Sequence, residues 1–267
     1  MEKIYEILNK KEVRGEIGLE VEAEGKYLPT GNLPSWNIEN DGSLRGVFPD
    51  TRAEYVFRKP LPINEVKEAL KELFNEGVRI GTKWEFSYRC STHVHLNILD
   101  LTVDELNALV YTYLLLEEPL VRYCGRERIH NRFALRTQDA EQTLEYIHFL
   151  LSEGPAALAL RNENQIRYAG LNLAALQKYG SLEFRSMRGT SDQGVLNNWI
   201  EAIYCLKKFC KEKTLQQVKQ MFIELDSEAF AKEVLGDLYN VFKYVKLPYD
   251  MRFSFSLSLP ICYVERK

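Results

Sequence analysis

The 267-residue sequence lacks several features that define common protein classes. Its five cysteines include no C-x-x-C pair, so we expect neither a zinc ribbon nor a disulfide framework, and we predict reduced thiols in a cytoplasmic protein. The longest apolar run, residues 108–116, is far shorter than the ~20 residues of a membrane-spanning helix. The first residues mix charged and apolar side chains and show no signal-peptide core.

An excess of positive charge and the common nucleotide-binding loops are missing too. The chain has 35 Lys and Arg residues against 38 Asp and Glu residues, which argues against non-specific nucleic-acid binding. Neither G-x-G-x-x-G nor G-x-x-x-x-G-K-[ST] occurs, so the two usual glycine-rich phosphate loops are excluded. Because no linker or repeat divides the chain, we expect one domain over residues 1–267, helical at 192–250.

Hydrophobic patterns predict the secondary structure. Residues 14–24 alternate apolar side chains with glutamates, the period of a half-buried strand. Further strands are expected at 54–59, 83–89, 93–97 and 181–186, an extended segment at 251–264, and helices at 63–75, from 102 onward, 140–151, 192–211 and 227–245. Thr102 and Glu105 form a capping box, and Gly77 is expected to end the helix before it. Irregular alternation of strands and helices predicts an α+β fold with a largely antiparallel sheet.

Three of the expected strands carry a pair of chemically active side chains at alternate positions. The pairs are Glu20 and Glu22, His93 and His95, and Glu183 and Arg185. Side chains two apart on a strand share a face. The glutamate pair fits either a solvated sheet face or a site where Mg²⁺ or Mn²⁺ offsets the repulsion. The imidazole pair fits a metal or phosphate site, and a cross-strand salt bridge explains the third pair equally well.

Further arginines and carboxylates extend this set. Arg185 and Arg188 lie in the last expected strand and just beyond it, and a guanidinium holds phosphate or carboxylate oxygens with two parallel hydrogen bonds. Asp41 precedes a glycine and fits a simple turn as well as a site, while Glu54 begins an apolar strand and fits an ordinary edge position. Carboxylates, imidazoles and arginines on one sheet face are the combination that phosphoryl transfer uses.

Six short motifs occur in order within residues 14–200: Gly18-Leu19-Glu20-Val21-Glu22, Asp41-Gly42-Ser43-Leu44, Glu54-Tyr55-Val56, Ser91-Thr92-His93-Val94-His95, Gly170-Leu171-Asn172-Leu173 and Gly180-Ser181-Leu182-Glu183-Phe184-Arg185. This ordered set resembles the amidoligase family, small relatives of glutamine synthetase and glutamate–cysteine ligase. The resemblance implies a glutamine-synthetase-like catalytic domain, with helices on the convex face of a curved, mostly antiparallel sheet and the active site on the concave face. It also implies joining of a carboxylate to an amine through an acyl phosphate, with ATP and Mg²⁺ (or Mn²⁺).

The resemblance further implies roles for individual residues. The metal ligands that it implies are Glu20, Glu22, Glu54, His93, Glu183 and Asp41. His95 and Arg185 would contact ATP, and the catalytic group would comprise Arg185, Arg188 and Glu54. Arg128 and Asn131 fall where the family has an arginine and an asparagine, but the Tyr-Cys pair that follows there is Phe133-Ala134 in this chain.

The sequence thus favours an ATP- and Mg²⁺-dependent carboxylate–amine ligase acting on small-molecule or peptide substrates, without nucleic-acid or membrane partners. One alternative is a zinc-dependent hydrolase built on His93 and His95. Another is a ligase fold that has lost catalysis and serves as a binding module. The sequence leaves the substrates and the oligomeric state open.

Overall fold

A computed structural model of the protein describes residues 2–45, 51–129, 131–154 and 168–242. Seven strands form one sheet in the order β2-β3-β1-β5-β7-β6, and β4 pairs with β1. The strands are β1 (Ile17–Lys26), β2 (Trp36–Glu39), β3 (Arg52–Phe57), β4 (Lys83–Glu85), β5 (Ser91–Asn97), β6 (Leu171–Asn172) and β7 (Ser181–Arg188). All of these strands pair in antiparallel fashion, so the predicted α+β class with an antiparallel sheet is confirmed.

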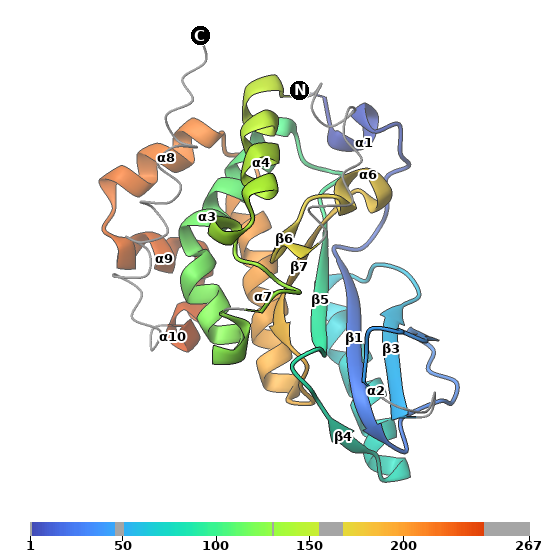
Figure 1. Cartoon of the computed structure of the whole chain (residues 1–267). Helices are drawn as coiled ribbons and strands as arrows, with labels where there is room; N and C mark the ends of the chain where they lie inside the picture. Colours follow the sequence, from blue (N-terminus) through green and yellow to red (C-terminus); the bar gives the residue numbers. More distant parts are fainter. Residues whose placement is uncertain (1, 46–50, 130, 155–167, 243–267) are drawn as a thin grey trace.

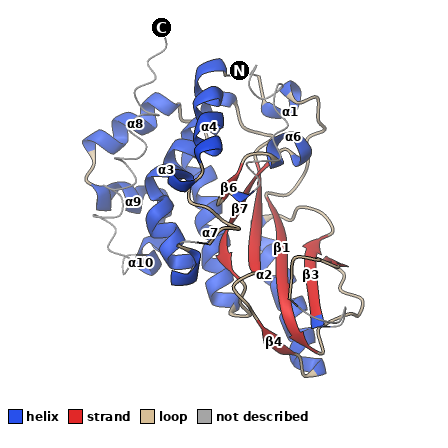
Figure 2. Ribbon diagram, in the orientation of Figure 1, coloured by secondary structure: helices blue, strands red, loops and turns tan. Residues whose placement is uncertain are grey.

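Helices flank this sheet, and the largest pack behind it (Figures 1 and 2). The α-helices are α1 (Ile4–Ile7), α2 (Ile63–Ile80), α3 (Val103–Cys124), α4 (Glu141–Glu153), α6 (Ala175–Tyr179), α7 (Gln193–Cys210), α8 (Leu215–Glu224), α9 (Ser227–Leu235) and α10 (Tyr239–Phe242). Three 3₁₀ turns are η2 (Arg126–Arg128), η3 (Thr137–Asp139) and η5 (Gly236–Leu238). Within the described residues, no helix has the length and apolar character needed to cross a membrane.

Strand β1 shows how the sequence pattern becomes a two-faced sheet. Its odd-numbered side chains from Ile17 to Ala23 are at most 1% exposed and belong to the hydrophobic core. Helix α7 meets this core with Trp199 and Ile203, both fully buried. Because side chains alternate along a strand, the glutamates of β1 lie on the other face, away from the core helices.

Helix α3 is buried along almost its whole length, which suits a helix enclosed between the sheet and other helices. Its first turn carries the predicted capping box, in which the Thr102 side chain accepts from the Glu105 amide and Glu105 accepts from the Thr102 amide. Asp192 likewise caps α7 as a predicted boundary, accepting from the Val195 amide. These caps confirm two of the predicted helix starts.

Other predicted boundaries were wrong. Gly77 does not end α2, which continues to Ile80 and is capped by Gly81 in the left-handed region at φ 76°. The strand expected at 83–89 stops at Glu85. The helix expected at 227–245 is broken at Gly236 (φ 56°), and its last three residues, like the segment at 251–264, lie outside the described residues.

Candidate active site

The sheet order brings the three predicted pairs together. Strand β5 lies between β1 and β7, so residues far apart in sequence become cross-strand neighbours. Glu20 lies opposite His93, and His95 lies opposite Glu183. These side chains therefore lie on a common face of the sheet, opposite the core, as their alternate spacing predicts.

Glu20 lies between the two imidazoles. Its two carboxylate oxygens are 2.9 Å from His93 Nδ1 and 3.1 Å from His95 Nε2. Burial by itself would raise the pKa of Glu20, but hydrogen bonds from both histidines outweigh it and hold the pKa far below its usual range. Burial would lower the pKa of His95, but the hydrogen bond to Glu20 and the negative charges of Glu183 and Glu20 together outweigh burial and raise that pKa. The centre of the site thus favours an ionised Glu20 carboxylate beside the imidazole of His95.

Glu183 is the second buried carboxylate of this centre. It pairs with Arg185 on its own strand, accepts from Asn172 Nδ2 at 2.5 Å, and lies 3.5 Å from His93 Nδ1. Burial would raise its pKa, but Arg185 first, and then the two histidines, lower it overall. Asn172 on β6 thereby fixes one oxygen of Glu183, while the other oxygen faces Arg185 and His93.

A second group of carboxylates lies toward β3. Glu22 is opposite Glu54 across the β1–β3 pair, and both lie close to Asp41. Burial, reinforced by the charges of Glu20 and Glu22, raises the pKa of Glu54 to about 8. Glu22 accepts hydrogen bonds from both the amide and the hydroxyl of Ser91, at 2.7 and 2.8 Å. The negative charges of the neighbouring carboxylates therefore disfavour ionisation of Glu54.

The donor set fits a divalent cation. Three triplets have ligand atoms within 4.8 Å of one another: Glu20, His95 and Glu183; Glu20, Glu54 and His93; Glu22, Asp41 and Glu54. Carboxylate oxygens with few imidazoles suit Mg²⁺ or Mn²⁺. Each triplet contains at most one histidine, so among the described residues the histidine pair does not form a joint ligand set of the kind a two-histidine zinc site needs.

Two predicted residues have other local partners. Arg188 donates to the carbonyl of Cys124 at 2.9 Å, at the end of α3, and no bond joins it to the acidic centre within the described part of the chain. Asp41 accepts from the Ser43 amide and hydroxyl, both at 2.7 Å, which is the turn geometry expected for an Asp before glycine. Asp41 is nevertheless close enough to Glu22 and Glu54 for the three carboxylates to bind one cation.

Sequence reasoning missed several partners of the site. Ser91 bonds both Glu22 and His93, and it stands two positions before His93, so the same period could have identified it. Asn172 belongs to one of the motifs that carry the family resemblance, but no role was predicted for it, although it donates to Glu183. Arg128 was identified only through the family resemblance and without a role, and its contacts are with the backbone of β7.

An apolar cavity of about 310 Å³ adjoins the acidic centre. Glu20 and His95 form one wall, while Val56, Phe57 and Tyr179 contribute apolar surface. The rings of His95 and Tyr179 meet edge to face with centroids 5.6 Å apart. No lysine or arginine lines this cavity, so it suits an uncharged flat or apolar group attached to a cation-bound one.

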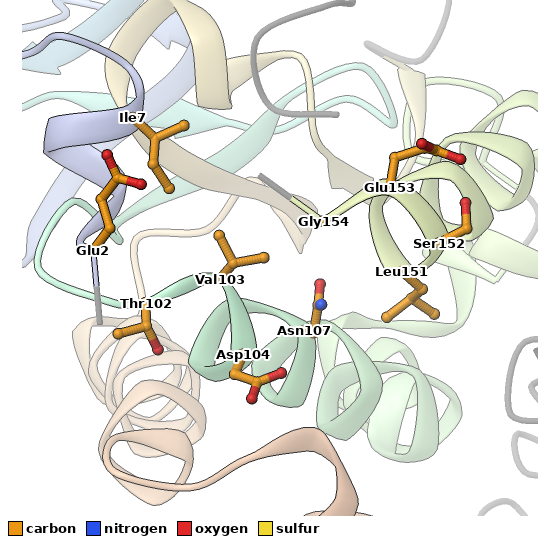
Figure 3. A pocket seen from close by; sticks show the side chains of 10 residues that line it. All are labelled: Glu2, Ile7, Thr102, Val103, Asp104, Asn107, Leu151, Ser152, Glu153 and Gly154. Carbon is orange, nitrogen blue, oxygen red and sulfur yellow. The ribbon is translucent and has the colours of Figure 1, made fainter. Parts of the chain in front are cut away.

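Another cavity, of about 440 Å³, lies between the N-terminal segment, the start of α3 and the end of α4 (Figure 3). Its walls include Thr102, Asn107 and Leu151. It shares no lining residue with the acidic centre. Of the two cavities, only the one of about 310 Å³ is lined by residues of the acidic centre, namely Glu20 and His95.

Comparisons with known proteins show which family the chain resembles. The family described as "Putative amidoligase enzyme" matches residues 18–207, a span that holds all the side chains of the acidic centre. No curated protein matches the chain. A solved bifunctional glutathione synthetase from Pasteurella multocida is similar at 10% identity and a TM-score of 0.45, over 92% of this chain. The present chain spans only 49% of that protein.

Proposed function

The chain belongs to the amidoligase family, and from the site that it carries we propose that it is an ATP-dependent carboxylate–amine ligase. In the proposed reaction the γ-phosphoryl group of ATP passes to a substrate carboxylate, and an amine then displaces phosphate from the acyl phosphate to form an amide. The overall products are the amide, ADP and phosphate.

One observation carries the proposal. Glu20, His93, His95, Glu183 and Arg185 come from three adjacent strands and contact one another on a single sheet face. Phosphoryl transfer requires both cation ligands and a guanidinium beside the transferred group. A merely structural role would not require so many carboxylates on a face that the core does not use.

We propose distinct roles within this set. Glu20, Glu22, Glu54, His93 and Glu183, with Asp41 at the edge, would hold Mg²⁺ or Mn²⁺, which when bound neutralises phosphate charge. Arg185, with Glu183 fixing its position, would face the transferred phosphoryl group. His95, partly buried beside Glu20, would donate to the phosphates. A catalytic role for Arg188 requires that, when substrate binds, its guanidinium leaves the carbonyl at the end of α3 and contacts the substrate.

We propose that the nucleotide base binds in the apolar cavity. Its wall at Glu20 and His95 adjoins the cation ligands, and its far wall is apolar with Tyr179 at the edge. A purine ring fits the uncharged end of such a cavity while the phosphates reach the acidic end.

We extend the proposal to the architecture: a single glutamine-synthetase-like catalytic domain over residues 1–267. The strand order and the position of the acidic face support it. The substrates would be small-molecule or peptide carboxylates and amines.

The test is ATP turnover with Mg²⁺ in the presence of mixed carboxylates and amines, following ADP and phosphate. Glu20→Ala, His93→Ala and Glu183→Ala should each lose roughly 100-fold or more in turnover while keeping the circular-dichroism spectrum of the folded chain. Glu85→Ala is the matched control, since Glu85 is an exposed carboxylate on β4 of the same sheet. If Mg²⁺ does not bind and the three variants retain full turnover, the proposal is wrong.

A further inference from the structure

Strand β7 contains an irregularity beside the site. Thr92 pairs with Met187, but Val94 pairs with Phe184, so the single residue His93 on β5 lies opposite both Arg185 and Ser186. This two-against-one arrangement is a β-bulge, which leaves backbone groups unpaired and redirects side chains. Here it lets Arg185 lie with the acidic centre while Met187 is fully buried in the core.

One buried side chain bonds both bulged residues. Arg128 donates from Nε to the Ser186 carbonyl at 2.9 Å and from Nη2 to the Arg185 carbonyl at 2.8 Å. The residue is 1% exposed, and its Nη1 has no partner among the described residues. Burying a guanidinium without a full set of partners is costly. Its two bonds to consecutive carbonyls are the contacts that offset this cost.

A sharp turn after α3 brings Arg128 to the bulged strand. Helix α3 ends at Cys124, and Gly125 adopts φ 123°, a conformation that other residues rarely adopt. The 3₁₀ turn η2 follows and ends at Arg128. In the reverse direction Arg188 of β7 donates to the Cys124 carbonyl. The end of α3 and the bulged strand are thus joined by one arginine from each side.

We propose that Arg128 is a positioning residue that fixes the bulge and thereby holds Arg185 beside Glu183. Glu183 lies before the bulge and is held separately by Asn172. Loss of Arg128 should therefore loosen the bulge that carries Arg185, weaken its contact with Glu183 and leave Glu183 in place. The inference rests on the proposed function only in treating Arg185 and Glu183 as working residues.

The test is a double-mutant cycle read out by Mn²⁺ titration with electron paramagnetic resonance. Arg185→Gln removes a positive charge beside a cation ligand, so Mn²⁺ should bind about fivefold more tightly. Arg128→Lys keeps the charge but replaces the guanidinium fork by a single nitrogen, which cannot reproduce the two bonds to consecutive carbonyls, so Mn²⁺ binding should tighten in the same direction. In the Arg185→Gln background, Arg128→Lys should not change the Mn²⁺ affinity further, because Arg128 is proposed to act through Arg185. Equal effects in both backgrounds would overturn the inference.

The matched control is Arg136→Lys. Arg136 is a buried arginine in the same stretch of chain, and it donates to Glu118 on α3 at 2.7 Å. Its replacement should lower the melting temperature as Arg128→Lys does but leave Mn²⁺ affinity unchanged. If Arg128→Lys also leaves the affinity unchanged, Arg128 is only structural and the inference fails.

A second readout separates this inference from the proposed function. If the unaltered chain binds no Mn²⁺, the proposed function fails, and arginine side-chain NMR decides the inference alone. Arg128→Lys must shift the Arg185 Nε–H signal, which is identified by its loss in Arg185→Gln, and Arg136→Lys must not. If Arg128→Lys does not fold, exchange of the Arg128 Nε–H in the unaltered chain decides: slow exchange supports the bulge contact, and exchange at the rate of free arginine overturns it.

Discussion

At the scale of single residues, two glutamates on adjacent strands show how neighbours set acidity. Glu20 accepts hydrogen bonds from two imidazoles, and these depress its pKa despite its burial. Glu54 is buried among carboxylates, and its pKa rises to about 8. A bound cation reverses this second effect, because it prefers the ionised carboxylate.

Cation binding is therefore expected to depend on pH through Glu54. Below about pH 8 a cation must displace the Glu54 proton, so Mn²⁺ affinity should rise by up to about tenfold per pH unit from pH 6 and level off near pH 8. Glu54→Gln should flatten this profile and weaken binding at pH 8. Isothermal titration at several pH values measures both effects. Glu39→Gln, an exposed neighbour on β2, should keep the slope, and a flat profile in the unaltered chain would contradict the prediction.

At the scale of elements, period and capping signals predicted what depends on local sequence. The alternation in β1, the pairs on β5 and β7, and the capping box at Thr102 all hold in the structure. Long-range contacts decided the rest. The bulge at Arg185 depends on pairing with β5, and the glycine at position 77 lies inside α2, where Trp84 leaves no room for a Cβ. Neither contact has a local signature.

For Gly77 in α2, the structure predicts that alanine destabilises the protein, whereas helix propensity alone predicts that it stabilises the protein. Replacing an interior helix glycine by alanine usually stabilises by about 1 kcal/mol. Here an added Cβ would lie 2.6 Å from Trp84 Cζ2, so Gly77→Ala should destabilise by about 1–3 kcal/mol through overpacking. Urea unfolding measures the change. Val78→Ala, at a position 79% exposed on the same helix, should be neutral or stabilising, and a stabilised Gly77→Ala would show that the ring moves freely.

At the scale of the whole molecule, a buried acid on α3 affects overall stability. Glu117 accepts from the Thr137 amide and hydroxyl, at 2.9 and 2.8 Å, and from Tyr113. Burial raises its pKa to about 7, although these bonds and the charge of Arg136 partly oppose the rise. The contact attaches the segment after η2 to the central helix, behind the strand that carries Arg185.

The free energy of unfolding should therefore decrease as pH rises from about 4.5 to about 7. Over this window the unfolded chain releases the Glu117 proton while the folded protein retains it, so the folded state binds more protons and loses stability with rising pH. The shift corresponds to about 3 kcal/mol at most. Urea unfolding at pH 5 and pH 7 should show a smaller difference for Glu117→Gln than for the unaltered chain. An identical difference in both proteins would refute the assignment to Glu117.

The central place of β5 in the sheet has a consequence for biosynthesis. Its imidazoles meet Glu20 from a strand made earlier and Glu183 from a strand made much later. On the ribosome, a nascent chain that has emerged only through β5 can bring the histidines beside the first glutamate. It cannot close the acidic centre until β7 emerges and pairs. The cation site that we propose would therefore be complete only after β7 (Ser181–Arg188) has been made, and translation products that stop before β7 would lack the Glu183 ligand.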